Sequence, residues 1–362
     1  MSTSAAAPAL AAQRRHQRAW LAVGAGLVVL LAAMIVSLGI GAVRIAPARV
    51  IAILAAEVGL HSGSLGALDA VTMTRDRAVI VAIRLPRVLG GLLVGSSLAV
   101  CGAALQGLFR NPLAGPSLVG VSSGAALAAA ATIVLGGGAS AWLLPAGAFA
   151  GGLAAVTLVY LLATRDRRTD VATLLLAGIA INALAGAGNG VFTFLATDAQ
   201  LRDITFWSLG SLGGITWRTL TVSGPVMALA VVALPRLSRE LNALLLGERE
   251  AAHIGTNVQL VKIVTVAVVA AGVGASVSIS GVIGFIGLVA PHLVRLLVGP
   301  DYRTLLPGSA VMGALLLLLA DLAARTVVAP AELPIGIVTA LVGGPFFVWL
   351  LLRHRGRRLA HA

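Results

Sequence analysis

The sequence has very little cysteine or lysine and few charged side chains of either sign. Its single cysteine, Cys101, lies inside an apolar stretch, which excludes an intrachain disulfide and a cysteine-based metal site. Its single lysine, Lys262, stands between Val261 and Ile263, whereas a phosphate-binding loop requires a Gly-Lys-Ser/Thr segment. The chain also has no His-Glu-x-x-His segment. We therefore exclude ATP binding through such a loop and zinc binding through this motif.

Apolar residues dominate what is present. Hydrophobic residues make up 59% of the 362 residues and charged residues 11%, and the stretches 111–164 and 263–291 contain no charged side chain. About 20 apolar residues in a helix cross a bilayer core of roughly 30 Å, and lipid-exposed backbone must satisfy its own hydrogen bonds. Because the alternating pattern of a membrane β-barrel is absent, the composition predicts an all-α, polytopic membrane protein.

Membrane orientation follows from the basic residues. If the N-terminus is cytoplasmic, most of the 26 basic residues fall on the cytoplasmic side, so the formal charge of +13 orients the chain and no nucleic-acid partner is expected. We predict basic cytoplasmic tails at 1–19 and 353–362 and a transmembrane domain at 20–352. The boundary near Ser278 is the least defined, because 258–298 is barely long enough for two spans. The ten predicted spans are 20–43, 88–109, 117–136, 142–163, 171–196, 219–235, 258–276, 280–298, 305–323 and 334–352.

The largest predicted cytoplasmic loop is 236–257. It contains the acidic residues Glu248 and Glu250 and the small residues Gly247, Ala252 and Gly255, preceded by the apolar Leu246. A short helix that ends at Gly255 would fit the groove of a partner protein. The alternative, a solvated loop, would leave Leu244, Leu245 and Leu246 without a place of burial. We therefore favour partner docking.

Three arginines lie at predicted outer span ends: Arg84, Arg87 and Arg325. One interpretation is that they are interfacial anchors, with Arg325 paired to Asp321 one helical turn away. The other is that the two arginines around Pro86 form a rigid acceptor for carboxylates of a soluble protein. The residues alone leave both interpretations open.

Two features would suit an enzyme or a ligand site. The segment 120–124 (GVSSG) matches the G-x-S-x-G pattern of serine hydrolases, but it opens an apolar helix and only His292 is buried enough to serve as a base. Helix packing is the favoured interpretation. His253 and His292 both lie toward the predicted cytoplasmic side, where a lone histidine is more often a hydrogen-bonded helix residue than a ligand. Contact with a transported substrate is the alternative for both histidines.

An ion-coupled secondary carrier would use carboxylates in the middle of its spans. The predicted spans offer only Asp321, near a span end. The sequence also shows no arrangement of a nucleophile and a base, which counts against a membrane enzyme. Energy for any transport is therefore expected from another protein.

In their order along the chain, the motifs resemble those of permease subunits of binding-protein-dependent, ATP-driven importers for iron chelates, haem and cobalamin. The similarity covers nearly the whole chain from Ile40 onward. Gly115 departs from the pattern, because the family usually has an acidic residue before the proline. The matching motifs are Arg84-Leu-Pro-Arg87, Gln106 with Asn111-Pro-Leu-Ala114, Gly120 to Ala125, Gly247-Glu248 with Ala252 and Gly255, Gly281 to Arg295, Asp321 to Arg325, Glu332 to Gly336 and Gly344 to Phe347.

The resemblance implies a type II ABC importer permease with about ten transmembrane helices per subunit. It implies a pore made by two copies of the chain as a homodimer, two cytoplasmic ATP-binding subunits, and a periplasmic or lipid-anchored substrate-binding protein. ATP and Mg²⁺ would be used by the partner ATPase, so the permease would bind no cofactor or metal and would not itself be an enzyme. The implied roles are binding-protein docking at Arg84, Arg87 and Arg325, ATPase coupling through the loop 236–257, and a cytoplasmic gate at Asn111, Leu113 and, by position only, Thr169.

Within that family, the segments 180–186, 198–203 and 206–214 and the residue His253 look most like haem permeases. Siderophore permeases share many of these features. The resemblance therefore implies import of haem or a related iron chelate across the bacterial inner membrane, with a ferric siderophore or cobalamin as the alternative substrate.

Overall fold

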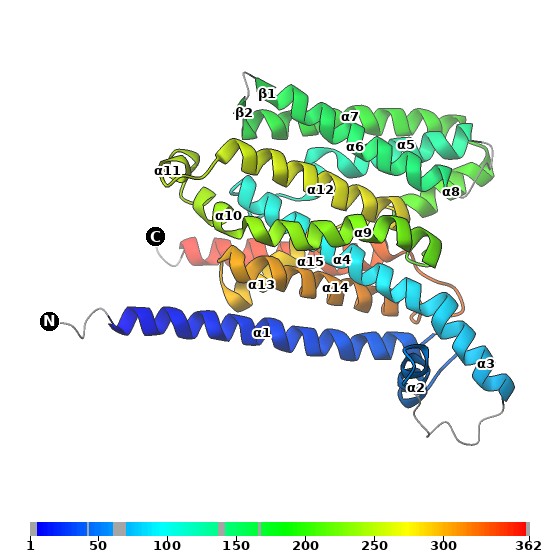
Figure 1. Ribbon diagram of the computed structural model, residues 1–362. Helices are drawn as coiled ribbons and strands as arrows, with labels where there is room; N and C mark the ends of the chain where they lie inside the picture. The colour runs from blue at the N-terminus through cyan, green and yellow to red at the C-terminus, as the bar shows by residue number, and fades with distance from the viewer. Residues whose placement is uncertain (1–5, 42, 61–69, 137–141, 166–167, 360–362) are drawn as a thin grey trace.

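The computed structural model describes residues 6–41, 43–60, 70–136, 142–165 and 168–359, and nearly all of its secondary structure is helical (Figure 1). A two-residue antiparallel hairpin pairs β1 (Thr164–Arg165) with β2 (Arg168–Thr169). The first helices are α1 (Ala6–Gly39), α2 (Pro47–Glu57), α3 (Ala70–Ala78), the π-helix η1 (Val79–Arg84), α4 (Leu85–Leu108), the 3₁₀ helix η2 (Pro116–Val119), α5 (Val121–Leu135), α6 (Leu143–Ala163) and α7 (Val171–Leu195). The remaining helices are α8 (Asp198–Leu209), α9 (Trp217–Ala233), the 3₁₀ helix η3 (Leu234–Leu237), α10 (Ser238–Leu244), α11 (Glu248–His253), α12 (Val258–Ser280), α13 (Ile286–Val298), α14 (Tyr302–Ala324) and α15 (Ile335–Leu359).

Membrane spans are recognisable among these helices. Within the described ranges, seven helical stretches are long and apolar enough to cross a membrane, and three shorter apolar helices accompany them. The shorter ones are 121–135, 286–298 and 335–350. Each of the ten predicted spans overlaps one of these ten stretches, so the prediction of an all-α protein with about ten membrane helices is confirmed.

The helices run between two distinct ends (Figure 1). The beginning of α1, the end of α15, the β1–β2 hairpin, α10 and α11 lie at one end, which we call the terminal end. Helices α2, α3 and α8 lie at the opposite end, which we call the distal end. This arrangement places the loop 236–257 and the predicted outer arginines at opposite ends of the molecule.

Helix α4 forms the centre of the packing and contacts α14, α12, α13 and α9. Small residues allow its backbone to come close to its neighbours. A Cβ atom added at Gly95 would lie 2.4 Å from the carbonyl oxygen of Gly313, and one added at Gly102 would lie 1.9 Å from that of Gly287. Close backbone approach replaces the hydrophobic driving force that helices lack in lipid. The glycine-rich composition of the spans therefore serves packing at these positions.

Two predicted boundaries are corrected by the structure. The second span does not begin at 88, because an unbroken helix runs from Thr72 through η1 to Leu108, and Arg84 and Arg87 therefore lie within a helix. Helix α12 extends to Ser280, and an irregular segment to Phe285 leaves α13 short. Gly281 starts this break with a φ of +65°, and a Cβ there would lie 2.1 Å from the carbonyl oxygen of Trp207.

Candidate functional site

Arg87 lies in a charged cluster at the distal end. Its guanidinium donates hydrogen bonds to the Asp321 carboxylate at 2.8 and 3.0 Å and to the two Glu332 oxygens at 2.9 and 3.0 Å. Asp321 is near the end of α14, and Glu332 is in the segment before α15. The hydrogen bonds from Arg87 hold the pKa of Glu332 below its usual value. The cluster therefore ties three separate stretches of the chain together.

The other two predicted docking arginines are also held inside the protein. Arg325 forms the expected ion pair with Asp321 at 3.3 Å and donates to the carbonyl oxygens of Ser37 and Ile40 at the end of α1. Arg84 donates to the carbonyl oxygens of Leu38 and Val43. Arginine suits this task because its rigid fork of donors can serve several acceptors at once.

The exposed fractions are 5% for Arg84, 9% for Arg87 and 8% for Arg325. The expected ion pair between Arg325 and Asp321 is present, and all three guanidinium groups are buried within the chain. The reason is that the end of α1 and the acidic residues Asp321 and Glu332 cover these arginines. Their docking role stays a prediction.

At the terminal end, the loop 236–257 folds into α10 and α11. Gly247 has a φ of +124° and Gly255 a φ of +88°, so both glycines adopt backbone conformations that other residues rarely adopt. Leu246 and Ile254 are 67% and 65% exposed. Of the three leucines that a solvated loop would leave without a place of burial, Leu244 is buried within the chain, whereas Leu245 and Leu246 are exposed. The predicted short helix is present as α11, which ends at His253, and Gly255 lies two residues beyond its end.

A polar network joins this loop to the β1–β2 hairpin. The Lys262 ammonium donates to the Glu248 carboxylate at 2.7 Å and to the Thr169 carbonyl oxygen at 2.7 Å. The Gln259 side chain donates to the Thr169 hydroxyl at 2.7 Å and accepts from the Thr169 amide at 3.1 Å. Sequence reasoning used Lys262 only to exclude a phosphate loop and did not single out Gln259. A lone lysine between two apolar residues is the signal that could have identified this network.

The predicted gate residues belong to two different segments of the chain. Asn111 and Leu113 lie in the exposed turn after α4, where the Asn111 side chain accepts a hydrogen bond from the Leu113 amide at 2.9 Å. Thr169 is 3% exposed and belongs to the Lys262 network. The gate assignment stays a prediction.

The histidines lie on different helices. His253 is exposed at the end of α11, and His292 packs edge-on against the ring of Phe346 on α15 with centroids 5.7 Å apart. In the G-x-S-x-G segment, the Ser123 hydroxyl bonds to the Gly120 carbonyl and to Asn182 of α7. These contacts are those of packed helices. In the part of the chain that the structure describes, no group of three His, Cys, Asp or Glu residues could hold a metal ion.

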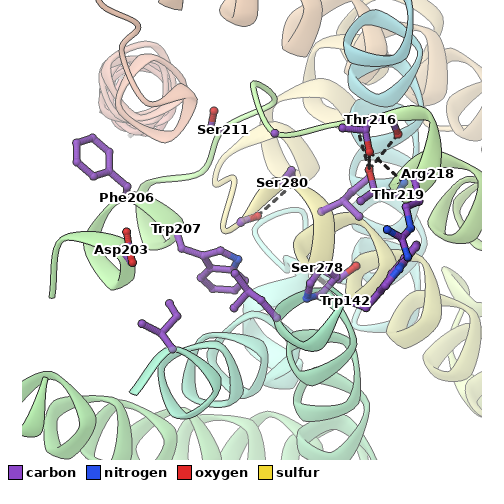
Figure 2. Close-up of a pocket in the computed structure, with 16 residues that line it drawn as sticks. Trp142, Asp203, Phe206, Trp207, Ser211, Thr216, Arg218, Thr219, Ser278 and Ser280 are labelled. Atoms are coloured by element: carbon purple, nitrogen blue, oxygen red, sulfur yellow. Dashed lines mark hydrogen bonds between the residues drawn. The ribbon is translucent and has the colours of Figure 1, made fainter. Parts of the chain in front are cut away.

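A cavity of about 530 Å³ opens at the distal end, between the ends of α6, α8, α9 and α12. Figure 2 shows Trp207 near its middle, Trp142 and Arg218 to one side, and Asp203 and Phe206 to the other. The Arg218 guanidinium lies 4.7 Å from the ring centroid of Trp142. Ligand sites in proteins are concave and mostly apolar, with a few polar groups, and this cavity has that character.

Comparison with known proteins supplies the wider context. The FecCD transport family matches residues 29–353. The chain is 47% identical over 323 residues to the hemin transport system permease protein HmuU of Yersinia pestis, covering 84% of this chain and 95% of that protein. It is 45% identical over 285 residues to the cobalamin import system permease protein BtuC of Halobacterium salinarum, covering 78% and 76%. It is 46% identical over 276 residues to the vitamin B12 import system permease protein BtuC of Escherichia coli O9:H4, covering 75% and 83%.

A solved structure has the same fold. It is an inward-facing conformation of a metal-chelate type ABC transporter, with a TM-score of 0.79 and 32% sequence identity. The match covers 91% of this chain and 98% of the other.

Proposed function

The chain belongs to the FecCD transport family and is a multi-pass permease subunit of an ABC importer, and we propose that it imports haem or a related iron chelate. Permeases of this family bind no cofactor, and ATP is used by a partner ATPase. An importer of this kind also requires a substrate-binding protein. The substrate, the composition of the complex and its orientation are the proposed parts.

The distal cavity carries the substrate proposal. Its lining includes Asp203, Phe206, Trp207 and Ser211, which belong to the segments 198–203 and 206–214 that look most like haem permeases. Indole rings stack on flat aromatic ligands, and an arginine binds carboxylates. Haem is a flat macrocycle with two carboxylate side chains, so Trp207 and Arg218 together match its chemistry.

We assign the terminal end to the cytoplasm, where the basic tails 1–19 and 353–362 and the loop 236–257 would then lie. The distal end faces the periplasm across the bacterial inner membrane. Two copies of the chain form the pore, two ATPase subunits bind at the loop 236–257, and a periplasmic or lipid-anchored binding protein docks at the distal end. The proposed ATPase contact residues are Leu246, Gly247, Glu248, Glu250, Ala252 and Gly255.

The distal cluster of Arg87, Asp321 and Glu332 is the proposed docking area. Glu332 is 47% exposed at its side chain, whereas the arginines are covered. A carboxylate of the binding protein would therefore meet Arg87 only after displacing Glu332. This refines the docking prediction for Arg84, Arg87 and Arg325 without removing it.

The inner gate is proposed at Asn111, Leu113 and Thr169. His253 on α11 and His292 on α13 are proposed substrate contacts on the exit side. The reason is that the predicted orientation places both histidines toward the cytoplasm. Haem iron accepts imidazole ligands, which fits a haem substrate.

Reconstitution tests the substrate directly. The chain is inserted into vesicles with candidate ATPase and binding-protein partners, and ATP-driven uptake of hemin, a ferric siderophore and cobalamin is compared. We expect hemin to be taken up, and Trp207→Ala to lower that uptake about fivefold through lost stacking. Trp20→Ala on α1 is the matched control and should transport normally. Uptake of a siderophore but not of hemin would contradict the haem proposal.

Cobalamin is the second candidate, because two relatives of 45% and 46% identity carry the name of cobalamin or vitamin B12 permeases. Cobalamin uptake without hemin uptake in the same vesicles would favour it. That outcome would leave the assignment as an importer unchanged and would change only the proposed substrate.

A further inference from the structure

Lys262 is a buried charge that three elements share. Its side chain is 6% exposed, and its ammonium bonds to Glu248 at the start of α11 and to Thr169 in β2, while Lys262 itself lies in the first turns of α12. An ammonium group has three donors and no acceptor, and burying it is costly unless it is paired and hydrogen-bonded. Glu248 and Thr169 are thus both needed to keep Lys262 in place.

The hairpin is clamped to α12 at two points. Gln259 and Lys262 are three residues apart, so their side chains lie on the same face of the helix. Gln259 holds the amide and hydroxyl of Thr169, and Lys262 holds its carbonyl oxygen. The Thr169 hydroxyl is also bonded to Tyr160 of α6 at 3.2 Å. Movement of the first turns of α12 would therefore be passed to Thr169.

The two short helices of the loop are attached to different places. In α10, the Asn242 side chain donates to Asp301 at 2.7 Å and accepts from the Tyr302 amide at 3.0 Å, which joins α10 to the start of α14. In α11, Glu248 is joined to Lys262. Only the second attachment continues to the hairpin.

We propose that Lys262 is the positioning residue through which Glu248 of the ATPase-binding loop moves the hairpin residue Thr169. The proposal rests on the proposed function, in which the loop 236–257 binds the ATPase and Thr169 belongs to the inner gate. Lys262 converts displacement of α11 into displacement of the hairpin.

The transport test uses the whole complex in vesicles. Lys262→Met keeps the length of the side chain and removes its charge, and Glu248→Gln keeps its size. Lys262→Met should bind the ATPase and hydrolyse ATP, but move about fivefold less substrate per ATP, the effect of one lost hydrogen bond. Because Glu248 is itself a proposed ATPase contact, Glu248→Gln is compared only in complexes that retain the ATPase, where the same loss of substrate per ATP is expected. The double variant should be no worse than either single variant, because both break the same link. Glu57→Gln, which breaks the separate ion pair between Glu57 and Arg77 at the distal end, is the matched control and should keep the wild-type ratio.

A distance measurement separates coupling from loss of structure. Spin labels are placed at the exposed positions Arg168 and Arg249 in a Cys101→Ala background. In the wild-type complex the distance between the labels should stay the same with and without ATP, because the elements move together. In Lys262→Met the distance should change on ATP binding.

The outcomes are distinct. A Lys262→Met complex with the wild-type substrate-to-ATP ratio and the wild-type label distances overturns the proposal for Lys262 alone. Multiplying effects in the double variant also overturn it. A wild-type chain that binds no ATPase overturns the proposed function, and this inference with it.

Discussion

Buried cations lie at both ends of the helices, but the two ends hold them differently. At the distal end, Arg87 and Arg325 share Asp321, and Arg87 has a second carboxylate in Glu332. At the terminal end, Lys262 has one carboxylate and one carbonyl oxygen. The distal cations each have several acceptors in stretches that lie far apart in the sequence, whereas Lys262 joins α11 to the hairpin through one carboxylate and one carbonyl oxygen, so that these two elements move together. The comparison indicates a fixed distal clamp and a movable terminal link.

The largest effect should come from breaking the distal clamp. Asp321→Ala leaves Arg87 and Arg325 buried beside each other with their shared carboxylate gone, which should cost about 3 to 5 kcal/mol of folding free energy. A thermal unfolding curve in detergent measures this loss. Asp198→Ala, at an exposed acidic residue of α8, should change the midpoint little. Equal midpoints for both variants would contradict the clamp.

The terminal link should respond unequally to loss of its two charged members. Glu248→Ala leaves a buried ammonium without its carboxylate and should cost about 3 kcal/mol. Lys262→Met leaves Glu248, 39% exposed at its side chain, free to be hydrated, and should cost about 1 kcal/mol. Unfolding in detergent compares the two. The opposite order would show that Lys262 is not buried as the structure has it.

A substitution at Gly255 tests the coupling role of the loop 236–257, because it changes only the backbone strain at this position. No atom lies within 4 Å of a Cβ built there, but its φ is +88°, so Gly255→Val should cost about 1 to 2 kcal/mol and lower transport. Gly186→Ala in α7 has the same open space in helical backbone and should stabilise the chain by about 0.5 to 1 kcal/mol. Normal transport by an assembled Gly255→Val complex would contradict the coupling role of the loop.

The smallest expected effect concerns pH. Arg87 lowers the pKa of Glu332 from the model-compound value of 4.5, so the pair stabilises the fold above that pH and loses its contribution as the pH falls through the lowered value. Because Glu332 is half-exposed, the effect should be below about 1 kcal/mol. Unfolding midpoints of the wild type and Glu332→Gln should differ at neutral pH and converge in acid. A constant difference would exclude this pair as the cause.

Much of the fold could be predicted from the sequence, because membrane helices depend on local composition. Uncharged stretches such as 111–164 need only length and hydropathy to be recognised as spans. The left-handed backbone at Gly255 was also predictable from its place after a short polar helix. The start of the helix that contains α4 was not predictable, because two arginines, Arg84 and Arg87, usually mark the end of a membrane helix. Their burial inside a helix is explained only by hydrogen-bond acceptors that lie far away in the sequence.

The class of protein, the approximate number of spans and the family could be read from the sequence, since these depend on hydropathy and on ordered motifs. The Arg325–Asp321 pair follows from their spacing along one helix, but the other partners of the buried cations depend on how the helices pack. Arg87 meets Asp321 and Glu332 across more than two hundred residues, and Lys262 meets Thr169 across 93 residues, while Glu248 lies 14 residues away. Such partners are chosen by helix packing, because the desolvated cation binds whichever acceptor the packed helices bring within reach. No local pattern of residues encodes that choice.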